Sequence, residues 1–206
     1  FASLYKNTTG NHNTAAGYYA MYDNKVGNYN TSIGYFANVA DTNLTNTIAI
    51  GFGSYVTSSD QIRFGNPTCS SIGGYSGWSN LSDARFKTNI KENVVGLEFI
   101  QKLRPVTYNL NMDAIARFNN TPDSLRLKES ETLKEAILQT GFIAQEVEKA
   151  AQELKYDFSG VDKPQNDKDS YALRYAEFVV PLVKAVQEQQ EMIEQLQKEV
   201  EALKKK

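Results

Sequence analysis

The 206-residue sequence predicts an α+β fold that begins with an all-β repeat region and ends in a coiled-coil helix. Three observations support this: Gly and Asn recur at fixed spacing early in the chain, helical and strand spacings follow, and heptads fill the end. Charged residues are scarce before residue 81 and frequent after it. We therefore expect repeats at 1–66, a connector at 67–81, a mixed α/β domain at 82–178 and a coiled-coil helix at 179–206.

The first region repeats itself. GNHNTAAGYYA at 10–20 returns as GNYNTSIGYFA at 27–37, 17 residues later, and NTIAIGFG at 46–53 is a third copy. A degenerate fourth copy starts at Arg63. One such unit cannot bury its own apolar face, so the copies predict a stacked array with strands near Ser32–Ile33 and Ile48–Ile50. The alternative is a disordered linker, which the alternating aromatic and aliphatic residues argue against.

The middle region alternates helix and strand signals. Val94, Leu97, Ile100 and Leu103 fall at helical spacing, and Pro105 should end that helix. The expected elements after it are a strand at 106–110 and a polar helical insertion at 112–137. A short apolar strand then runs into a helix over 140–147, and the helix continues to about residue 154. A polar loop at 157–170 and a strand at 170–175 follow.

A heptad seam marks the final helix, with Pro181 tolerated near its start. Such a seam is buried by self-association, and Glu199 can pair with Lys204 of a parallel neighbour. The a and d positions are Val179, Leu182, Val186, Gln189, Ile193, Leu196, Val200 and Leu203, preceded by Tyr175.

Composition excludes several functions. A net charge of −2 favours neither nucleic acid nor an anionic membrane surface, and no apolar run is long enough for a membrane span. His12 and Cys69 are the only residues of their kinds, so a Cys/His zinc site or a histidine-based triad is not expected. No cofactor fingerprint appears, and we expect neither a cofactor nor a metal.

Ser82 and Lys87, in SDARFK at the connector's end, are candidates for a nucleophile and its general base. Residues five apart do not meet on one regular strand or helix, so the backbone must bend, or Lys87 must reach a neighbouring chain's Ser82. Lysine is protonated at neutral pH and becomes a base only when burial lowers its pKa. The alternative interpretation is structural: Ser82 caps a turn, and Lys87 is solvated and has no catalytic role.

Four motifs occur in order: SDARFK, LEFIQKLRPVTYN, TGFIAQEVE and YALRYAEFVVPLVKAVQEQ. Together, over about residues 79–195, they resemble the intramolecular chaperone domain of endosialidases. This self-cleaving module ends phage tail spikes and fibres and occurs in a membrane-bound eukaryotic transcription factor family. The resemblance implies a homotrimerisation chaperone that cuts Leu81–Ser82, with Ser82 as nucleophile and Lys87 as base. Asp83, Arg85, Gln145 and Glu146 are candidate supporting residues.

The repeats resemble the left-handed β-roll heads of trimeric bacterial adhesins. With the chaperone resemblance they imply a homotrimeric virion tail fibre or cell-surface fibre, with a β-roll collar. The chain opens within the repeat pattern at Phe1, so we expect an upstream fibre segment as partner. One conflict remains, because β-branched a positions with Leu at d usually favour two strands over three. We follow the resemblance and expect three.

Two other functions compete with a single-turnover autoproteolytic serine peptidase. A structural trimerisation and attachment module would share every feature except cleavage. A fibre tip that binds a host-surface glycan or receptor would use Tyr18, Tyr19, Tyr35 and Phe36. We expect these rings to pack between coils or subunits instead.

Overall fold

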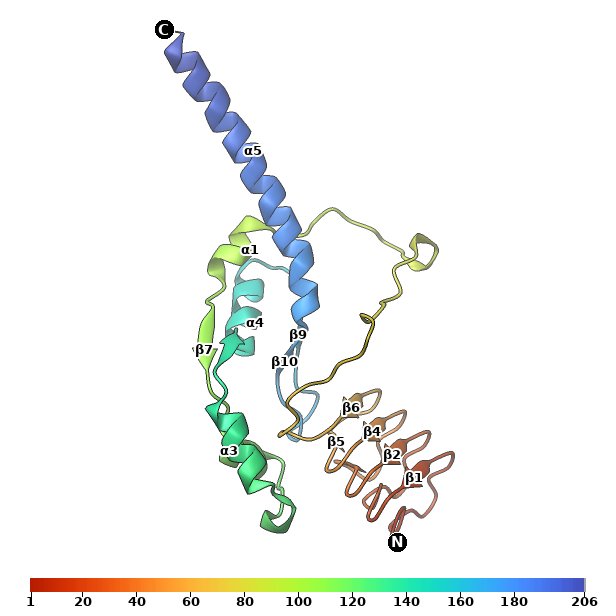
Figure 1. The fold of residues 1–206 in the computed structure, drawn as a ribbon. Coiled ribbons are helices and arrows are strands. Elements are labelled where there is room, and N and C mark those ends of the chain that lie inside the picture. The colour runs from red at the N-terminus through yellow and green to blue at the C-terminus, as the bar shows by residue number, and fades with distance from the viewer. Residues whose placement is uncertain (206) are drawn as a thin grey trace. The chain divides into compact units, whose positions relative to one another are not determined.

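The structure, a computed structural model, describes residues 1–205 as a mixed α/β fold with two compact units (Figure 1). The first unit contains Phe1–Tyr75, Tyr108–Gln139 and Pro164–Ser170. The second contains Ser76–Thr107, Thr140–Lys163 and the chain from Tyr171 onward. No helix within residues 1–205 combines the length and apolar character needed to cross a membrane.

The repeats of the first unit stack in parallel. The main sheet has the order β1 (Thr14–Ala16), β2 (Thr31–Ile33), β4 (Ile48–Ile50) and β6 (Ile62–Phe64). A second pair, β3 (Asn38–Val39) and β5 (Tyr55–Val56), is also parallel and was not expected from the sequence. Thr14 lies beside Thr31, and Thr31 beside Ile48, so the 17-residue repeat sets the register.

The recurring 17-residue spacing of asparagine and glycine in the repeats has a physical cause. The Asn13 side chain accepts a hydrogen bond from the Asn30 amide, and the fully buried Asn30 does the same for Thr47. Gly17 has a φ of +131°, and a Cβ there would lie 2.5 Å from the carbonyl oxygen of Gly34. Only glycine permits this approach of successive coils.

The third and fourth copies depart from the spacing read in the sequence. Because Thr31 pairs with Ile48, Thr47 takes the place of Asn13 and Asn30, and Asn46 lies one position earlier. Asn46 has a left-handed φ of 58°, like His12 and Tyr29. The last coil is shorter, since Ile48 pairs with Ile62 only 14 residues on.

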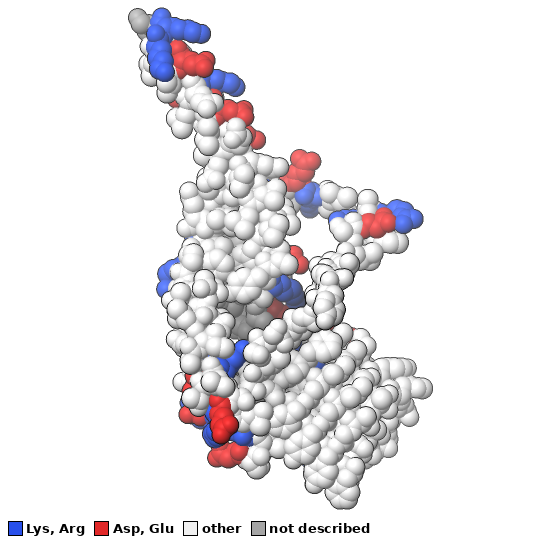
Figure 2. All heavy atoms as spheres, in the orientation of Figure 1, with Lys and Arg blue, Asp and Glu red and all other residues white. Residues whose placement is uncertain are grey.

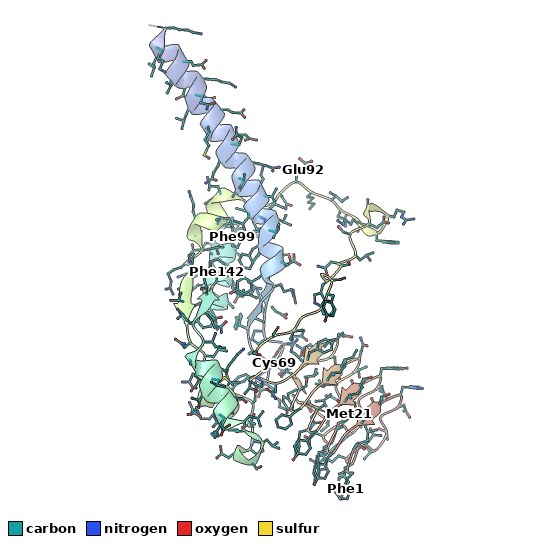
Figure 3. The ribbon with its side chains drawn as sticks, in the orientation of Figure 1. Phe1, Met21, Cys69, Glu92, Phe99 and Phe142 are labelled. Atoms are coloured by element: carbon teal, nitrogen blue, oxygen red, sulfur yellow. The ribbon has the colours of Figure 1, made fainter. Side chains whose placement is uncertain are left out.

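Aromatic rings stack from coil to coil, as we expected. Tyr18 stacks between Phe1 and Tyr35 at centroid distances of 5.4 and 5.6 Å, and Tyr35 stacks on Phe52 at 5.5 Å. Tyr19 stacks on Phe36 at 5.1 Å. Met21 is fully buried within the stack (Figure 3). Figure 2 shows that the visible face of the repeats carries almost no charge.

The insertion at 112–137 is helical, as expected. It contains α2 (Met112–Phe118), a 3₁₀ turn η2 (Asp123–Leu125) and α3 (Lys128–Ala136). Arg126 holds these parts together: its guanidinium bonds Glu131 at 2.6 Å and Asp113 at 2.5 Å. The Arg126 and Glu131 side chains are both largely buried, so each compensates the other's desolvation.

The second unit has its core around Phe99. Its helices are α1 (Leu97–Lys102), α4 (Ala144–Glu153) and α5 (Val179–Lys204), and its short strands include β9 (Val161–Asp162) and β10 (Ala172–Leu173). The remaining strands, β7 (Val106–Tyr108) and β8 (Gln139–Gly141), pair with each other. Phe99 packs against Phe158 and Val147, and all three are buried (Figure 3).

Several element boundaries differ from the sequence predictions: the strand expected at 106–110 ends at Tyr108, and three larger differences follow. Helix α1 starts at Leu97 rather than near Val94, because Gly96 is its N-cap. The polar loop expected at 157–170 contains β9, which pairs antiparallel with β10. The strand expected at 170–175 is only Ala172–Leu173, since a 3₁₀ turn, η3 (Tyr175–Phe178), follows and leads into α5.

Close packing joins α1 to the start of α5. A Cβ on Gly96 would lie 2.7 Å from Lys184 Cγ and 2.8 Å from the amide nitrogen of Ala185, so only glycine allows the two helices to meet here. Glu188 Oε2 accepts a hydrogen bond from the Leu97 amide at 2.7 Å, which satisfies one unpaired donor at the start of α1. This contact occupies one face of α5 and leaves its heptad seam free.

Candidate functional site

The candidate site lies in a long exposed segment between β6 and α1. From residue 70 to residue 93 almost every side chain is exposed, and the only regular element is the 3₁₀ turn η1 (Ala84–Phe86). Trp78 is 84% exposed and Leu81 is 80% exposed. Loops of this length are uncommon in compact domains and are usually functional or disordered.

The turn η1 follows from the residue at its start. Asp83 is the N-cap, with an extended backbone, and its carboxylate accepts a hydrogen bond from the Arg85 amide at 2.9 Å. Aspartate favours this position because its side chain satisfies an amide that the turn leaves unpaired. The backbone then closes through bonds from Phe86 to Asp83 and from Lys87 to Ala84.

The turn brings Ser82 and Lys87 together. Lys87 Nζ donates a hydrogen bond to Ser82 Oγ at 2.8 Å, within a single chain. The sequence required either a bend or a neighbouring chain for this contact, and the structure contains the bend. Heavy atoms at this distance are within the reach needed for proton transfer between a nucleophile and its base.

An ion pair braces the turn. The Arg85 guanidinium forms hydrogen bonds with both carboxylate oxygens of Asp83, at distances from 2.7 to 3.1 Å. This guanidinium holds the pKa of the Asp83 carboxyl below its ordinary value, with the Arg85 amide helping. The sequence made Asp83 and Arg85 candidate supporting residues but assigned them no role. The feature that indicates this turn is an Asp two residues before a backbone amide donor.

Solvent surrounds the pair in the single chain. Ser82 and Lys87 are both exposed, as are Leu81 and Phe86 beside them. Water therefore competes for the lysine ammonium group and for the serine hydroxyl. The arrangement places the candidate nucleophile and the candidate base next to the Leu81–Ser82 bond, with both side chains exposed to solvent.

The other candidate supporting residues lie apart from this contact. Glu146, in α4, bonds the Arg104 guanidinium at 2.6 and 3.0 Å, and Arg104 lowers the pKa of the Glu146 carboxyl. Gln145 is an exposed residue of the same helix. No group of three or more His, Cys, Asp or Glu side chains within residues 1–205 is arranged to hold a metal ion.

The seam residues lie on α5, with their apolar side chains exposed. These apolar side chains are Val179, Leu182, Val186, Ile193, Leu196, Val200 and Leu203. Gln189 is also exposed, and Tyr175 lies in η3 just before the helix. An isolated chain thus leaves an apolar stripe, interrupted at Gln189, in contact with water.

Part of the chain that contains this site matches a known protein family. Residues 82–156 match the family described as chaperone of endosialidase, and the match begins at Ser82. No curated protein and no solved structure matched the chain. The matched segment contains the Ser82–Lys87 contact, α1 and α4. The match over residues 82–156 to the chaperone of endosialidase family supports an intramolecular chaperone domain in this segment.

Proposed function

We propose that this chain is the C-terminal intramolecular chaperone of a phage tail fibre or surface fibre, that it trimerises the upstream fibre segment, and that it cuts itself at Leu81–Ser82. The observation that carries the proposal is the 2.8 Å hydrogen bond between Lys87 Nζ and Ser82 Oγ at the start of the chaperone match. Such a fibre belongs on a virion or a cell surface. The catalytic pair acts within one chain, because the turn η1 closes the gap between its members.

The chemistry needs only the chain and one water molecule. Neutral Lys87 takes the proton of Ser82 Oγ, and Oγ attacks the carbonyl carbon of Leu81. The bond between Leu81 and the Ser82 nitrogen breaks, and that nitrogen receives the proton, leaving Leu81 as an ester on Ser82. Water then hydrolyses the ester to a Leu81 carboxylate, and Ser82 becomes a free N-terminus.

Trimer assembly would supply the covering atoms around Lys87 that the single chain lacks. Apolar side chains lie close to the pair in sequence, namely Trp78, Leu81 and Phe86, and all are exposed. A second and third copy that covered these side chains would exclude water from Lys87 and favour its neutral form. Cleavage would then follow trimer formation, which the exposed seam of α5 drives.

A non-cleaving attachment module remains the alternative, and the mass of the folded chain on a denaturing gel separates the two. A glycan-binding tip has less support. The Tyr18, Tyr35 and Phe36 rings stack on neighbouring coils, so ring faces that a sugar would need are already covered.

The N-cap at Asp83 should control the cleavage rate. Asp83→Ala removes the acceptor that closes the turn, so Ser82 and Lys87 meet less often, and we expect cleavage to slow by roughly tenfold. Asp83→Asn keeps an acceptor, and Arg85→Met keeps the cap while removing the ion pair, so both should stay close to the parent rate. The rate is read from fragment appearance on a denaturing gel. An unchanged rate in Asp83→Ala would contradict a role for the cap.

Cleavage should make unfolding irreversible. The C-terminal part brings three chains into register and lowers the entropic cost of starting the repeats. After heating and cooling, the uncut Ser82→Ala chain should regain its trimer, whereas the cut fibre, once separated from its chaperone, should not. Light scattering before and after melting measures the recovery. Equal recovery of both forms would rule out a chaperone role and leave the structural alternative.

A further inference from the structure

The loop Pro164–Ser170 lies after the proposed cleavage site in sequence, yet it belongs to the same compact unit as the repeats. Its side chains reach the last two coils of the stack. The proposed function assigns this loop no role, and the sequence suggested only a polar connection. Its contacts define an interaction surface between the two future cleavage products.

Asp169 is the centre of this surface. Its side chain belongs to a residue only 8% exposed, and its carboxylate accepts hydrogen bonds from Thr57 Oγ1 at 2.7 Å and from Gln61 Nε2 at 3.5 Å. Two backbone amides of its own loop, from Gln165 and Ser170, add to these. Burial raises the pKa of this carboxyl, but the hydrogen bonds, that from Thr57 foremost, outweigh burial and hold it below its ordinary value.

Two neighbours of Asp169 extend the contact over successive coils. Asn166 Nδ2 donates to the carbonyl oxygen of Thr57 at 2.9 Å. Lys168 Nζ donates to the carbonyl oxygen of Ala40 at 2.9 Å and lies 3.3 Å from Asp41 Oδ2. Ala40 and Thr57 occupy equivalent positions, 17 residues apart. The loop therefore recognises a feature that repeats along the stack.

The contact lies where the stack ends. Within the stack, backbone amides of one coil donate hydrogen bonds to carbonyl oxygens of the next coil, as the Ala40 amide does to the Val56 carbonyl. At the last coil the amides of Thr57 and Ser58 instead bond Gln61 Oε1, and Gln61 is in turn held by Asp169. Repeat arrays need such a polar cap on their terminal unit, because no further coil covers it.

We propose that the Pro164–Ser170 loop is a docking element for the last coil of the repeats, and that it keeps the two fragments together after Leu81–Ser82 is cut. This rests on the proposed function only for the position of the cut. A second contact, from Lys134 Nζ to the carbonyl oxygen of Cys69 at 2.8 Å, also joins residues on opposite sides of that cut. Release of the chaperone part is then a separate step after the peptide bond breaks.

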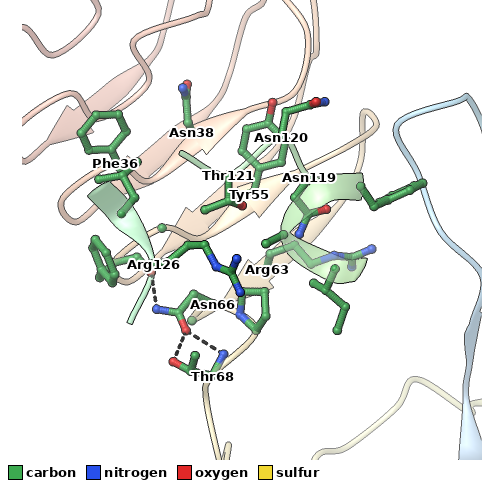
Figure 4. Close-up of a pocket in the computed structure, with 18 of the residues that line it drawn as sticks. Phe36, Asn38, Tyr55, Arg63, Asn66, Thr68, Asn119, Asn120, Thr121 and Arg126 are labelled. Carbon is green, nitrogen blue, oxygen red and sulfur yellow. Dashed lines mark hydrogen bonds between the residues drawn. The ribbon is translucent and has the colours of Figure 1, made fainter. Parts of the chain in front are cut away.

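The contacts between the Pro164–Ser170 loop and the repeats are polar. A hollow of about 550 Å³ lies between the repeats and the insertion, lined by Phe36, Tyr55 and Arg63 on one side and by Asn119 and Arg126 on the other (Figure 4). The contacts of the loop with the repeats are a few hydrogen bonds, so single substitutions should change the affinity measurably.

The test cuts the folded full-length chain with an external protease. Ser82→Ala prevents self-cleavage, and a site-specific protease sequence replaces part of the exposed segment 73–80. After cutting, both fragments should elute together from a size-exclusion column at micromolar concentration. Asp169→Ala should weaken their association by about tenfold or more, because it removes hydrogen bonds to a charged group. The exposed Lys168→Ala should weaken it less, and circular dichroism checks that each variant is folded.

Asp167→Ala is the matched control, since Asp167 is an exposed carboxylate in the same loop. It should leave the association unchanged. The docking proposal is overturned if the fragments separate with the native loop in place, or if Asp169→Ala and Asp167→Ala behave alike. A failure of self-cleavage in the native chain would count against the proposed function alone, because here the protease makes the cut.

Discussion

Replacing Ser82 with alanine should abolish self-cleavage while leaving the chain folded. The native chain, of 23.0 kDa, should convert into two fragments by a first-order process within assembled trimers, without added protease. Ser82→Ala removes the hydroxyl that we propose as the nucleophile, so the rate should fall by at least about a thousandfold. Because Ser82 is exposed and packs against no core, its loss should not change the melting temperature.

Lys87→Met should have nearly the same effect, since it keeps the length of the side chain and removes the base. The expected loss is roughly 10²–10⁴-fold, the usual contribution of a general base. Ser79→Ala and Lys91→Met are matched controls, because both residues are exposed in the same segment, and each should cleave at the native rate. N-terminal sequencing of the downstream fragment should start at Ser82. Any other start, or native cleavage in Ser82→Ala, would refute the assignment.

Polar substitution of the seam should dissociate the assembly. Ile193 and Leu196 are 48% and 60% exposed in the single chain, so burying the remaining surface of both should contribute roughly 1.5–3 kcal/mol per chain. Light scattering of the Ser82→Ala chain should give about three times 23.0 kDa. The double variant Ile193→Asn and Leu196→Asn should shift that mass toward the monomer at micromolar concentration.

The matched control places the same substitutions on the opposite face of α5. Glu191→Asn and Lys198→Asn lower helix propensity similarly but lie outside the seam, so the trimer should persist. A stable dimer of the parent chain would mean that the heptad preference of β-branched a positions prevails over the trimer that the family resemblance implies. A parent monomer would remove the basis for assembly-dependent cleavage.

Several features of the fold could be read directly from the sequence. The 17-residue repeat predicted strands that pair in register, because the close approach of successive coils requires glycine at Gly17 and again at Gly34. The expected helices near Leu97 and Ala144, and the long helix after Pro181, are present. Local periodicity encodes such elements, since side chains at fixed spacings share one face.

Only part of the candidate cleavage site could be predicted from the sequence. The motif named Ser82 and Lys87, but five residues of separation placed them on no common face. Whether they meet depended on the turn at Ala84–Phe86, which a single side chain, Asp83, closes. Their catalytic roles stay predictions until the substitutions above are measured.

By itself, the sequence determined the 17-residue register between β1 and β2, the helices near Leu97 and Ala144 and after Pro181, and the chaperone segment that starts at Ser82. Only the tertiary structure decided that Thr47 replaces an asparagine in the third coil, and that the loop at Asp169 docks on Thr57, 112 residues away. The physical reason is the separation along the chain between the residues that interact. Helical and strand periodicities arise between neighbours in the chain, whereas a buried carboxylate acquires its hydrogen-bond partners only when distant segments fold together.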